Sequence, residues 1–217
     1  MAAPSAADPH AELAASDPKL ARLIQQIDHA RIEARLQART TDRFEALCRI
    51  VAGQQVSTAA ARTVWGRVCE AFDGAPDPAQ LTAEGAEEKL RAAGLSGRKA
   101  SYMIGIAEAI EAGELRTQEL DEASDEEVIE TLVALRGLGR WSAEMFLLFD
   151  LGRPDVFSGG DLGLRHGIRI AYGLEEPPTP EEAVEIAERW APNRSLASLY
   201  LWEAVGIGLP VEIPEAG

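Results

Sequence analysis

Apolar residues recur along most of the chain at the three- and four-residue spacing that places them on one face of a helix. The two-residue alternation of a half-buried strand is nearly absent. Several apolar segments follow a residue that caps helices well, and Ser124 with Glu127 makes a capping box. The expected helices begin near residues 17, 42, 57, 84, 97, 124, 141, 161, 179 and 193. Nine or ten helices joined by short loops predict an all-α fold.

Length and composition bound the domain organisation. The chain has 217 residues, of which 46% are hydrophobic, enough for one large domain or two small lobes. Its first ten residues lack the positive flank and apolar run of a secretory signal, and no segment reaches membrane-spanning length. We therefore expect a flexible tail over residues 1–16, a globular domain over residues 17–217 and no contact with a membrane. The protein is expected to be cytoplasmic, and associated with the nucleoid if it is bacterial.

Cysteine and histidine are too few and too scattered to predict a metal centre. Cys48 and Cys69 each fall on the apolar side of an expected helix, where a reduced thiol behaves as a small hydrophobic group. Two cysteines cannot supply the four ligands of an iron-sulfur cluster. We expect no cofactor of this kind and no zinc site.

The net charge of -15 argues against a nucleic-acid partner, because affinity for phosphates usually comes from lysine and arginine. The acidic residues are unevenly spread, however. Residues 111–130 and 175–188 are strongly acidic, whereas residues 91–99, 136–140 and 153–169 lean basic. A local basic rim could bind DNA on one face, with weak non-specific affinity that moderate salt abolishes.

A glycine-containing turn separates two apolar segments in the second half of the chain. Gly137 and Gly139 lie in residues 135–143, Leu-Arg-Gly-Leu-Gly-Arg-Trp-Ser-Ala, before a helix that begins near Trp141. So short a turn exposes backbone amides at the positive end of the second helix, where they can bind phosphate. We expect phosphate contacts at Gly137, Gly139 and Arg140, and the alternative is an ordinary glycine C-cap.

Residues 154–164, Pro-Asp-Val-Phe-Ser-Gly-Gly-Asp-Leu-Gly-Leu, follow this hairpin and contain an aspartate that opens the next helix. Together the two stretches resemble the helix-hairpin-helix superfamily of DNA glycosylases, and within it the 3-methyladenine DNA glycosylase II branch, over about residues 44–202. The resemblance implies a two-lobed helical fold with a DNA-binding cleft between the lobes. Lobe A would comprise about residues 17–43 and 155–217, and lobe B about 44–154, without the N-terminal β-domain that some members carry.

Asp161 matches the catalytic aspartate of that family. From composition alone it is an N-cap, since aspartate favours a helix N-terminus. The resemblance implies a carboxylate that stabilises positive charge on the sugar, or orients water, while the N-glycosidic bond of an alkylated purine breaks. Close members often have two adjacent acids here, but Gly160 replaces the first. Asp155 lies too early in the loop, and we expect it to be a structural cap or ion-pair partner.

Trp141 occupies the hairpin position at which relatives that also cut the DNA backbone have a lysine. Tryptophan cannot form a Schiff base, so we predict a monofunctional enzyme. The resemblance places Trp141 in the base pocket, stacked on a cationic base, and the alternative is core packing. Trp202 aligns with a second pocket aromatic, although its helix would bury a tryptophan in any case. The family has a third pocket aromatic at the position of Met145. Methionine would give the base pocket a more flexible wall than an aromatic ring.

The remaining contacts also follow from the resemblance. Gln55 matches the wedge that fills the gap left by a flipped base, although a polar loop residue is an equal alternative. The expected further phosphate contacts are Ser96, Arg98 and Lys99, whose alternative is an exposed basic helix start. A structural Na⁺ or K⁺ at the hairpin carbonyls would be bound near Val133, Leu135 and Leu138.

These features predict a monomeric, monofunctional DNA glycosylase that flips an alkylated purine of the 3-methyladenine type out of double-stranded DNA and releases it by hydrolysis. One alternative is a non-catalytic helix-hairpin-helix DNA-binding module, in which Asp161 is only a cap. The other is a glycosylase for another lesion, such as an oxidised base or a mispaired pyrimidine.

Overall fold

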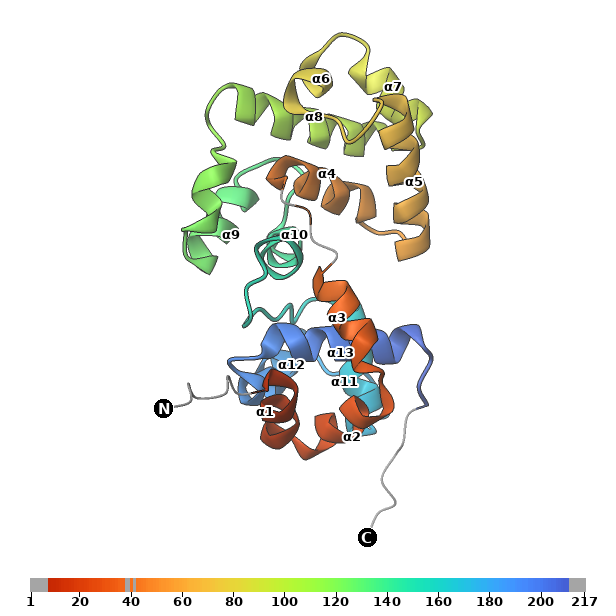
Figure 1. Ribbon diagram of the computed structural model, residues 1–217, viewed down its shortest axis with the longest axis vertical. Coiled ribbons are helices and arrows are strands. Elements are labelled where there is room, and N and C mark those ends of the chain that lie inside the picture. Colours follow the sequence, from red (N-terminus) through yellow and green to blue (C-terminus); the bar gives the residue numbers. More distant parts are fainter. Residues whose placement is uncertain (1–7, 38–39, 41, 211–217) are drawn as a thin grey trace, which may run out of the picture. The chain divides into compact units, whose positions relative to one another are not determined.

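The computed structural model describes residues 8–37, 40 and 42–210, and this part of the chain is helical throughout (Figure 1). It contains thirteen α-helices with short 3₁₀ and π segments, and none of the described residues forms a strand. The predicted all-α fold is confirmed. The chain divides into two compact units, one made of residues 1–39 and 152–217 and the other of residues 40–151. No helix in the described part of the chain has the length and apolar character needed to cross a membrane.

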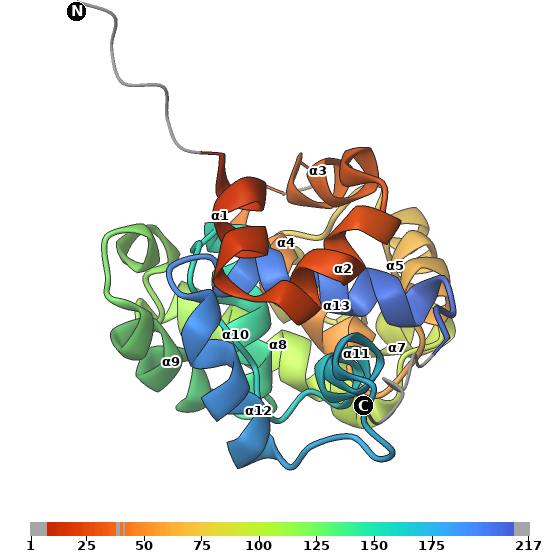
Figure 2. The same cartoon turned by 90° about the horizontal axis from the view of Figure 1, so that it is seen from below.

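The first unit combines both ends of the chain around helix α13. Its elements are α1 (Pro9–Ser16), α2 (Pro18–Gln26), α3 (His29–Gln37), α11 (Leu162–Tyr172), α12 (Pro180–Ala187), the 3₁₀ helix η3 (Glu188–Trp190) and α13 (Arg194–Gly206). Helix α13 packs against α1, α2, α3 and α11 (Figure 2). Residues 195–201 of this helix are all buried. Gly167 permits the α11 contact, because a Cβ there would lie 2.7 Å from the carbonyl oxygen of Leu201.

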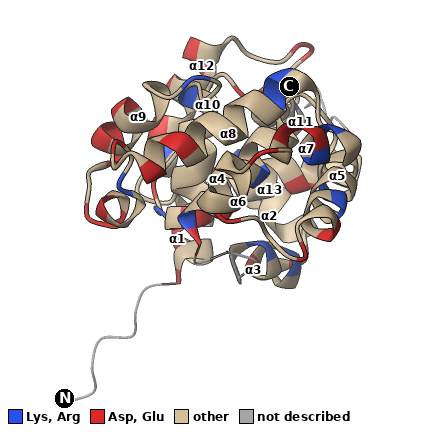
Figure 3. Ribbon diagram, turned by 90° about the horizontal axis from the view of Figure 1, so that it is seen from above, with Lys and Arg blue, Asp and Glu red and all other residues tan. Residues whose placement is uncertain are grey.

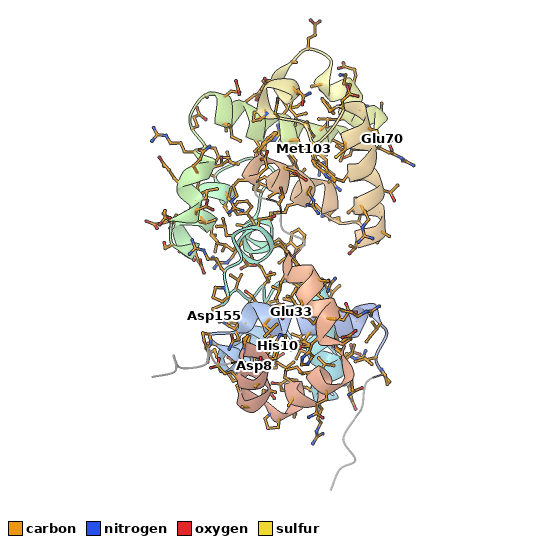
Figure 4. The ribbon with its side chains drawn as sticks, viewed as in Figure 1. Asp8, His10, Glu33, Glu70, Met103 and Asp155 are labelled. Atoms are coloured by element: carbon orange, nitrogen blue, oxygen red, sulfur yellow. The ribbon has the colours of Figure 1, made fainter. Side chains whose placement is uncertain are left out.

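The second unit is built around α4 and α8. Its elements are α4 (Arg43–Gly53), α5 (Thr58–Ala71), α6 (Pro78–Thr82), α7 (Ala86–Ala92), α8 (Gly97–Glu111), the 3₁₀ helix η1 (Thr117–Asp121), α9 (Asp125–Val133), α10 (Arg140–Phe146) and the π segment η2 (Leu147–Leu151). Helix α4 packs against α5, α8 and α10, and α8 also contacts α6 and α7. Leu47, Met103, Leu132 and Phe146 are fully buried, with Met103 on α8 (Figure 4).

Local capping signals are confirmed. Side chains cap the helices after Asp17, Asp42, Ser57, Ser124, Asp161 and Thr179. The pairs Ser124 with Glu127 and Thr179 with Glu182 form complete capping boxes. Each satisfies backbone amides that a helix N-terminus would otherwise leave exposed, so these signals fix where the helices begin.

The prediction of a flexible tail over residues 1–16 is wrong for residues 8–16, while residues 1–7 lie outside the described residues. Asp8 caps α1, and Leu13 is buried. His10 Nδ1 lies 2.6 Å from the Tyr200 hydroxyl, and its Nε2 lies 2.9 Å from Glu33 Oε1 (Figure 4). Helix α1 has a single large apolar side chain, so its sequence carries no clear helical period. Helices α1, α3 and α6 were not predicted from the sequence. They are short, and so few residues do not show a clear helical period of apolar positions.

Candidate functional site

Asp161 caps helix α11 and also binds an indole. Its Oδ1 accepts a hydrogen bond of 2.8 Å from the Leu164 amide and one of 2.9 Å from Trp202 Nε1. The first bond is that of an ordinary N-cap, but the second comes from α13, 41 residues away in the sequence. Two donors on one oxygen fix the orientation of a carboxylate that is only half-buried.

Gly163 leaves room for this arrangement, and its role was not predicted from the sequence. A Cβ at this position would lie 3.0 Å from Asp161 Oδ1 and 3.0 Å from Trp202 Cδ1. An alanine here would force its neighbours to move by a few tenths of an ångström, so the glycine has a packing reason. That reason is the close approach of the indole to the carboxylate.

The loop that leads to Asp161 is fixed to the start of α13 through Ser195. The Ser195 amide donates to the carbonyl of Pro154 at 3.0 Å, and its hydroxyl donates to the carbonyl of Arg153 at 2.6 Å. The same hydroxyl accepts a bond of 2.9 Å from the Val156 amide. Helix α13 therefore holds both the loop before Asp161 and the indole that binds it.

Asp155 has the structural role predicted for it. Its two carboxylate oxygens accept from Arg194 Nε at 2.8 Å and Nη2 at 2.9 Å. Burial alone would raise the pKa of Asp155, but the hydrogen bonds and charge of Arg194 outweigh burial, and the pKa is lowered. Asp155 is thus an ionised partner of Arg194.

The hairpin in the second unit has the predicted form of helix, tight turn and helix. Gly137 adopts φ +96°, and a Cβ there would lie 2.2 Å from Cγ of Tyr102, whose ring covers the glycine. Gly139 is the N-cap of α10 and is exposed, while Leu138 between the glycines is buried. Phosphate binding by the amides of this turn stays a prediction.

Trp141 and Met145 differ in exposure. Trp141, in the first turn of α10, is 36% exposed, so the alternative of core packing is wrong for it. Met145, one turn later, is 5% exposed and packs within the protein. The roles of Trp141, Met145 and Trp202 as walls of a base pocket stay predictions.

Gln55 lies in the loop between α4 and α5 with a left-handed backbone. Its φ is +55°, and both it and Val56 are exposed. A residue other than glycine pays about 1–2 kcal/mol for this conformation. An exposed residue held in a strained conformation is a frequent feature of functional loops.

The Lys99 ammonium binds carbonyl oxygens of the protein, and a phosphate contact by it stays a prediction. Nζ donates to the carbonyl oxygens of Ala52 at 2.9 Å and Gln54 at 2.7 Å, at the end of α4. Burial lowers the pKa of this ammonium. The hydroxyl of Ser96 accepts from the Lys99 amide at 3.3 Å and so caps α8, while Arg98 is exposed. Ser96 and Arg98 are both exposed, and phosphate contacts at these three residues stay predictions.

Arg140, beside the hairpin, is surrounded by acids. Its guanidinium lies 3.3 Å from Glu126 and 3.0 Å from Glu144. Both carboxylates raise the pKa of Arg140, and the hydrogen bond with Glu126 has the larger effect. The first turn of α9 is acidic, and Figure 3 shows red segments on this helix. A phosphate near Arg140 would therefore compete with Glu126.

Cation binding by the hairpin carbonyls stays a prediction. Leu135 lies in the turn, and its carbonyl accepts from the Leu138 amide at 3.2 Å, which leaves the second lone pair of that oxygen for another ligand.

Among the described residues, no three His, Cys, Asp or Glu side chains are grouped as a metal site. Cys48 and Cys69 are free thiols.

Comparison with known proteins gives the family. Residues 48–193 match the family described as HhH-GPD superfamily base excision DNA repair protein. The chain belongs to the HhH-GPD superfamily. The match includes the α4–α5 loop, the hairpin and Asp161, whereas Trp202 and the start of α13 lie just beyond it.

Individual relatives of this HhH-GPD chain agree with that assignment. DNA-3-methyladenine glycosylase 1 of Schizosaccharomyces pombe is 33% identical over 193 residues, which cover 88% of this chain and 84% of the relative. A solved structure of S. pombe 3-methyladenine DNA glycosylase (Mag1) in complex with abasic DNA has a TM-score of 0.81 at 31% identity, covering 91% of this chain and 96% of that one. DNA-3-methyladenine glycosylase of Bacillus subtilis is 32% identical, and the aligned part covers 76% of this chain but 57% of that relative.

Proposed function

We propose that this chain is a monofunctional DNA glycosylase that flips an alkylated purine, of the 3-methyladenine type, out of double-stranded DNA and hydrolyses its N-glycosyl bond. Its family acts in base excision DNA repair, and the relatives named above are 3-methyladenine glycosylases. The observation that carries the proposal is Asp161, a carboxylate fixed by the Leu164 amide and the Trp202 indole.

Asp161 stabilises the transition state electrostatically. Breaking the N-glycosyl bond builds positive charge on the sugar, and a preoriented carboxylate stabilises that charge or directs water to the anomeric carbon. The base leaves with the electron pair of the broken bond, water supplies the hydroxyl that the sugar gains, and the remaining proton of that water is released to solvent. Alkylation has already made the purine a good leaving group, so one carboxylate is sufficient.

Trp141 supports both the substrate class and the absence of a lyase step. Its exposed indole can stack on a base, and attraction between a cationic base and the ring contributes about 0.5–2 kcal/mol. A neutral, undamaged base lacks that attraction. Tryptophan has no amine with which to attack the sugar, so the proposed reaction ends at an abasic site.

The remaining parts of the proposal concern partners. Double-stranded DNA containing alkylated bases is the substrate, and the hairpin amides of Gly137 and Gly139 contact its phosphates. The protein acts as a monomer, and a monovalent cation such as Na⁺ or K⁺ is held by hairpin carbonyls. Its site of action is the cytoplasm, or the nucleoid in a bacterium.

The first experiment is release of free bases from methylated duplex DNA, analysed by chromatography. Strand breaks are followed in parallel with and without alkali, and borohydride is added to trap any Schiff base. We expect methylpurine release, breaks that require alkali, and no trapped protein. Binding without base release would favour the non-catalytic module, and release of oxidised bases alone would favour the other glycosylase class.

The contribution of the Trp202 indole is tested by Trp202→Phe. Phenylalanine keeps an aromatic ring but cannot donate to Asp161. Since a hydrogen bond to a charged group contributes about 1.5–3 kcal/mol, we expect base release in a single turnover to slow by about 10-fold or more. Trp65→Phe, a change of the same kind on α5, should leave the rate unchanged. Equal rates for wild type and Trp202→Phe would show that the indole does not orient the carboxylate.

A further inference from the structure

The loop that carries Gln55 is joined to the hairpin by the residue before it. The side-chain amide of Gln54 donates to the carbonyl of Gly137 at 2.8 Å and to the hydroxyl of Ser142 at 3.1 Å. Gly137 lies in the hairpin turn, and Ser142 is a buried residue in the first turn of α10. Gln54 therefore connects two segments 83 residues apart in the sequence.

The main chain of the same residue is held from the other side by α8. Lys99 Nζ donates to the carbonyl oxygen of Gln54 at 2.7 Å and to that of Ala52 at 2.9 Å. Both carbonyls belong to the end of α4, where helical partners are missing. A charged donor gives stronger hydrogen bonds than a neutral one, so Lys99 fixes the direction of the Gln54 carbonyl firmly.

These contacts lie directly before Gln55 in the chain. The Gln54 carbonyl belongs to the peptide group that joins Gln54 to Gln55, so fixing its direction fixes the plane on which the φ of Gln55 depends. Gln55 has a φ of +55°, which an unsupported residue other than glycine rarely keeps. Such strain persists only where the surrounding structure over-determines it. Here the support comes from Lys99 on the carbonyl and from the hairpin on the side chain of Gln54.

We propose that Gln54 and Lys99 are positioning residues, which hold Gln55 in its exposed left-handed conformation and couple the α4–α5 loop to the hairpin. The inference rests on the proposed function, in which Gln55 fills the gap left by the flipped base. Lys99 then acts through the loop rather than by binding phosphate. Gln54 is hydrogen-bonded to the hairpin and directly precedes Gln55 in the loop. Phosphate binding at the hairpin therefore positions Gln55 as the wedge.

The coupling predicts a dependence on base pairing. Opening a base pair costs a few kcal/mol, and a correctly placed wedge offsets part of that cost. A misplaced wedge should therefore slow release of a paired base much more than release of an unpaired one. A residue that only stabilises the fold would affect both substrates alike.

The experiment compares two oligonucleotides that each carry one 7-methylguanine, paired with cytosine in one and unpaired in a bulge in the other. Single-turnover release is measured for wild type, Lys99→Met, Lys99→Arg, Gln54→Met and the control Lys89→Met, which changes an exposed lysine of α7. Thermal melting of each variant reports folding. Fluorescence of a 2-aminopurine beside the lesion reports unstacking, and affinity for undamaged DNA is measured as a function of salt.

We expect Lys99→Met and Gln54→Met to release the paired base about 10- to 100-fold more slowly, with less unstacking, because small misplacements cost that much. Release from the bulge should change by less than about 3-fold, and Lys99→Arg should recover most of the loss since arginine also donates to carbonyls. Equal losses on both substrates, or no loss, would overturn the positioning role. A salt slope reduced by about one in Lys99→Met would instead identify a phosphate ligand. If wild type releases neither 7-methylguanine from these oligonucleotides nor any methylpurine from methylated duplex DNA, the proposed function fails, and this inference fails with it.

Discussion

Asp161→Asn is expected to slow release of methylated bases by about 10³-fold while leaving the fold and DNA binding intact, because removal of one electrostatic group from a transition state costs about 10²–10³ or more. Asparagine has the same shape and is as good an N-cap as aspartate. Its side-chain oxygen can still accept from the Leu164 amide and Trp202 Nε1, so only the negative charge is lost. The measurement is single-turnover release from methylated duplex DNA, with melting and binding recorded for the same samples.

The matched control for Asp161→Asn is Asp155→Asn, in the same unit. Asp155 is also a half-buried carboxylate, but its charge is paired with Arg194. This variant should melt at a lower temperature and retain base release within about 3-fold, since it removes the charge that pairs with Arg194 and leaves Asp161 unchanged, and partly exposed pairs contribute about 1 kcal/mol or less. If Asp161→Asn kept wild-type release, the non-catalytic module would replace the enzyme as the function of this chain.

The sequence predicts best those features that depend on residues close together in the chain. Ser124 and Glu127 are three residues apart, and their capping box could be identified from spacing alone. Asp161 likewise caps α11 as expected. The hairpin was also predictable, because its two glycines interrupt apolar segments within nine residues. In each case the interacting groups lie within one or two helical turns, where propensity decides the structure.

Features that depend on distant residues were not predictable in this way. Lys99 resembles an exposed basic helix start, and only the fold shows that its ammonium binds carbonyls 45 and 47 residues earlier. From the sequence, Gly163 is only an unfavourable residue for a helix. The fold shows that the indole of Trp202 packs against it. The resemblance to a family identified Asp161 and Trp202 separately, but it gave no geometry for their hydrogen bond. Tertiary packing decides such contacts, and a single sequence does not contain their distances.

Asp17→Ala should lower the stability of the first unit more than any other cap substitution. Asp17 is 1% exposed, caps α2 through the amides of Lys19 and Leu20, and accepts hydrogen bonds from the Tyr172 hydroxyl and, at 2.9 Å, from Trp190 Nε1. Alanine would leave four donors without this partner, two of them on buried side chains from α11 and η3. Since one unsatisfied buried donor costs about 1–3 kcal/mol, we expect a loss of about 3–5 kcal/mol and a fall in Tm of about 10 °C.

The pH dependence of stability tests how much the negative charge of Asp17 contributes to the fold. Burial alone would raise the pKa of Asp17, but the hydrogen bonds from Tyr172, Trp190 and the α2 amides outweigh burial, and the pKa is lowered. A carboxyl whose folded pKa is lowered stabilises the fold above its unfolded pKa of about 3.9, and this contribution disappears as the pH falls toward the folded value. The difference in Tm between wild type and Asp17→Asn should therefore be constant from pH 7 to about 5 and should shrink below about pH 4.

Asp28→Ala is the control, because Asp28 is an exposed carboxylate that accepts one bond of 2.9 Å, from the Ala30 amide. Its loss should cost about 1 kcal/mol, the usual contribution of a cap. Equal destabilisation by Asp17→Ala and Asp28→Ala would mean that the buried bonds to Tyr172 and Trp190 add nothing to capping. A larger loss for Asp17→Ala would show that one carboxylate joins α2, α11 and η3, and so connects the N-terminal helices to the helix that Asp161 begins.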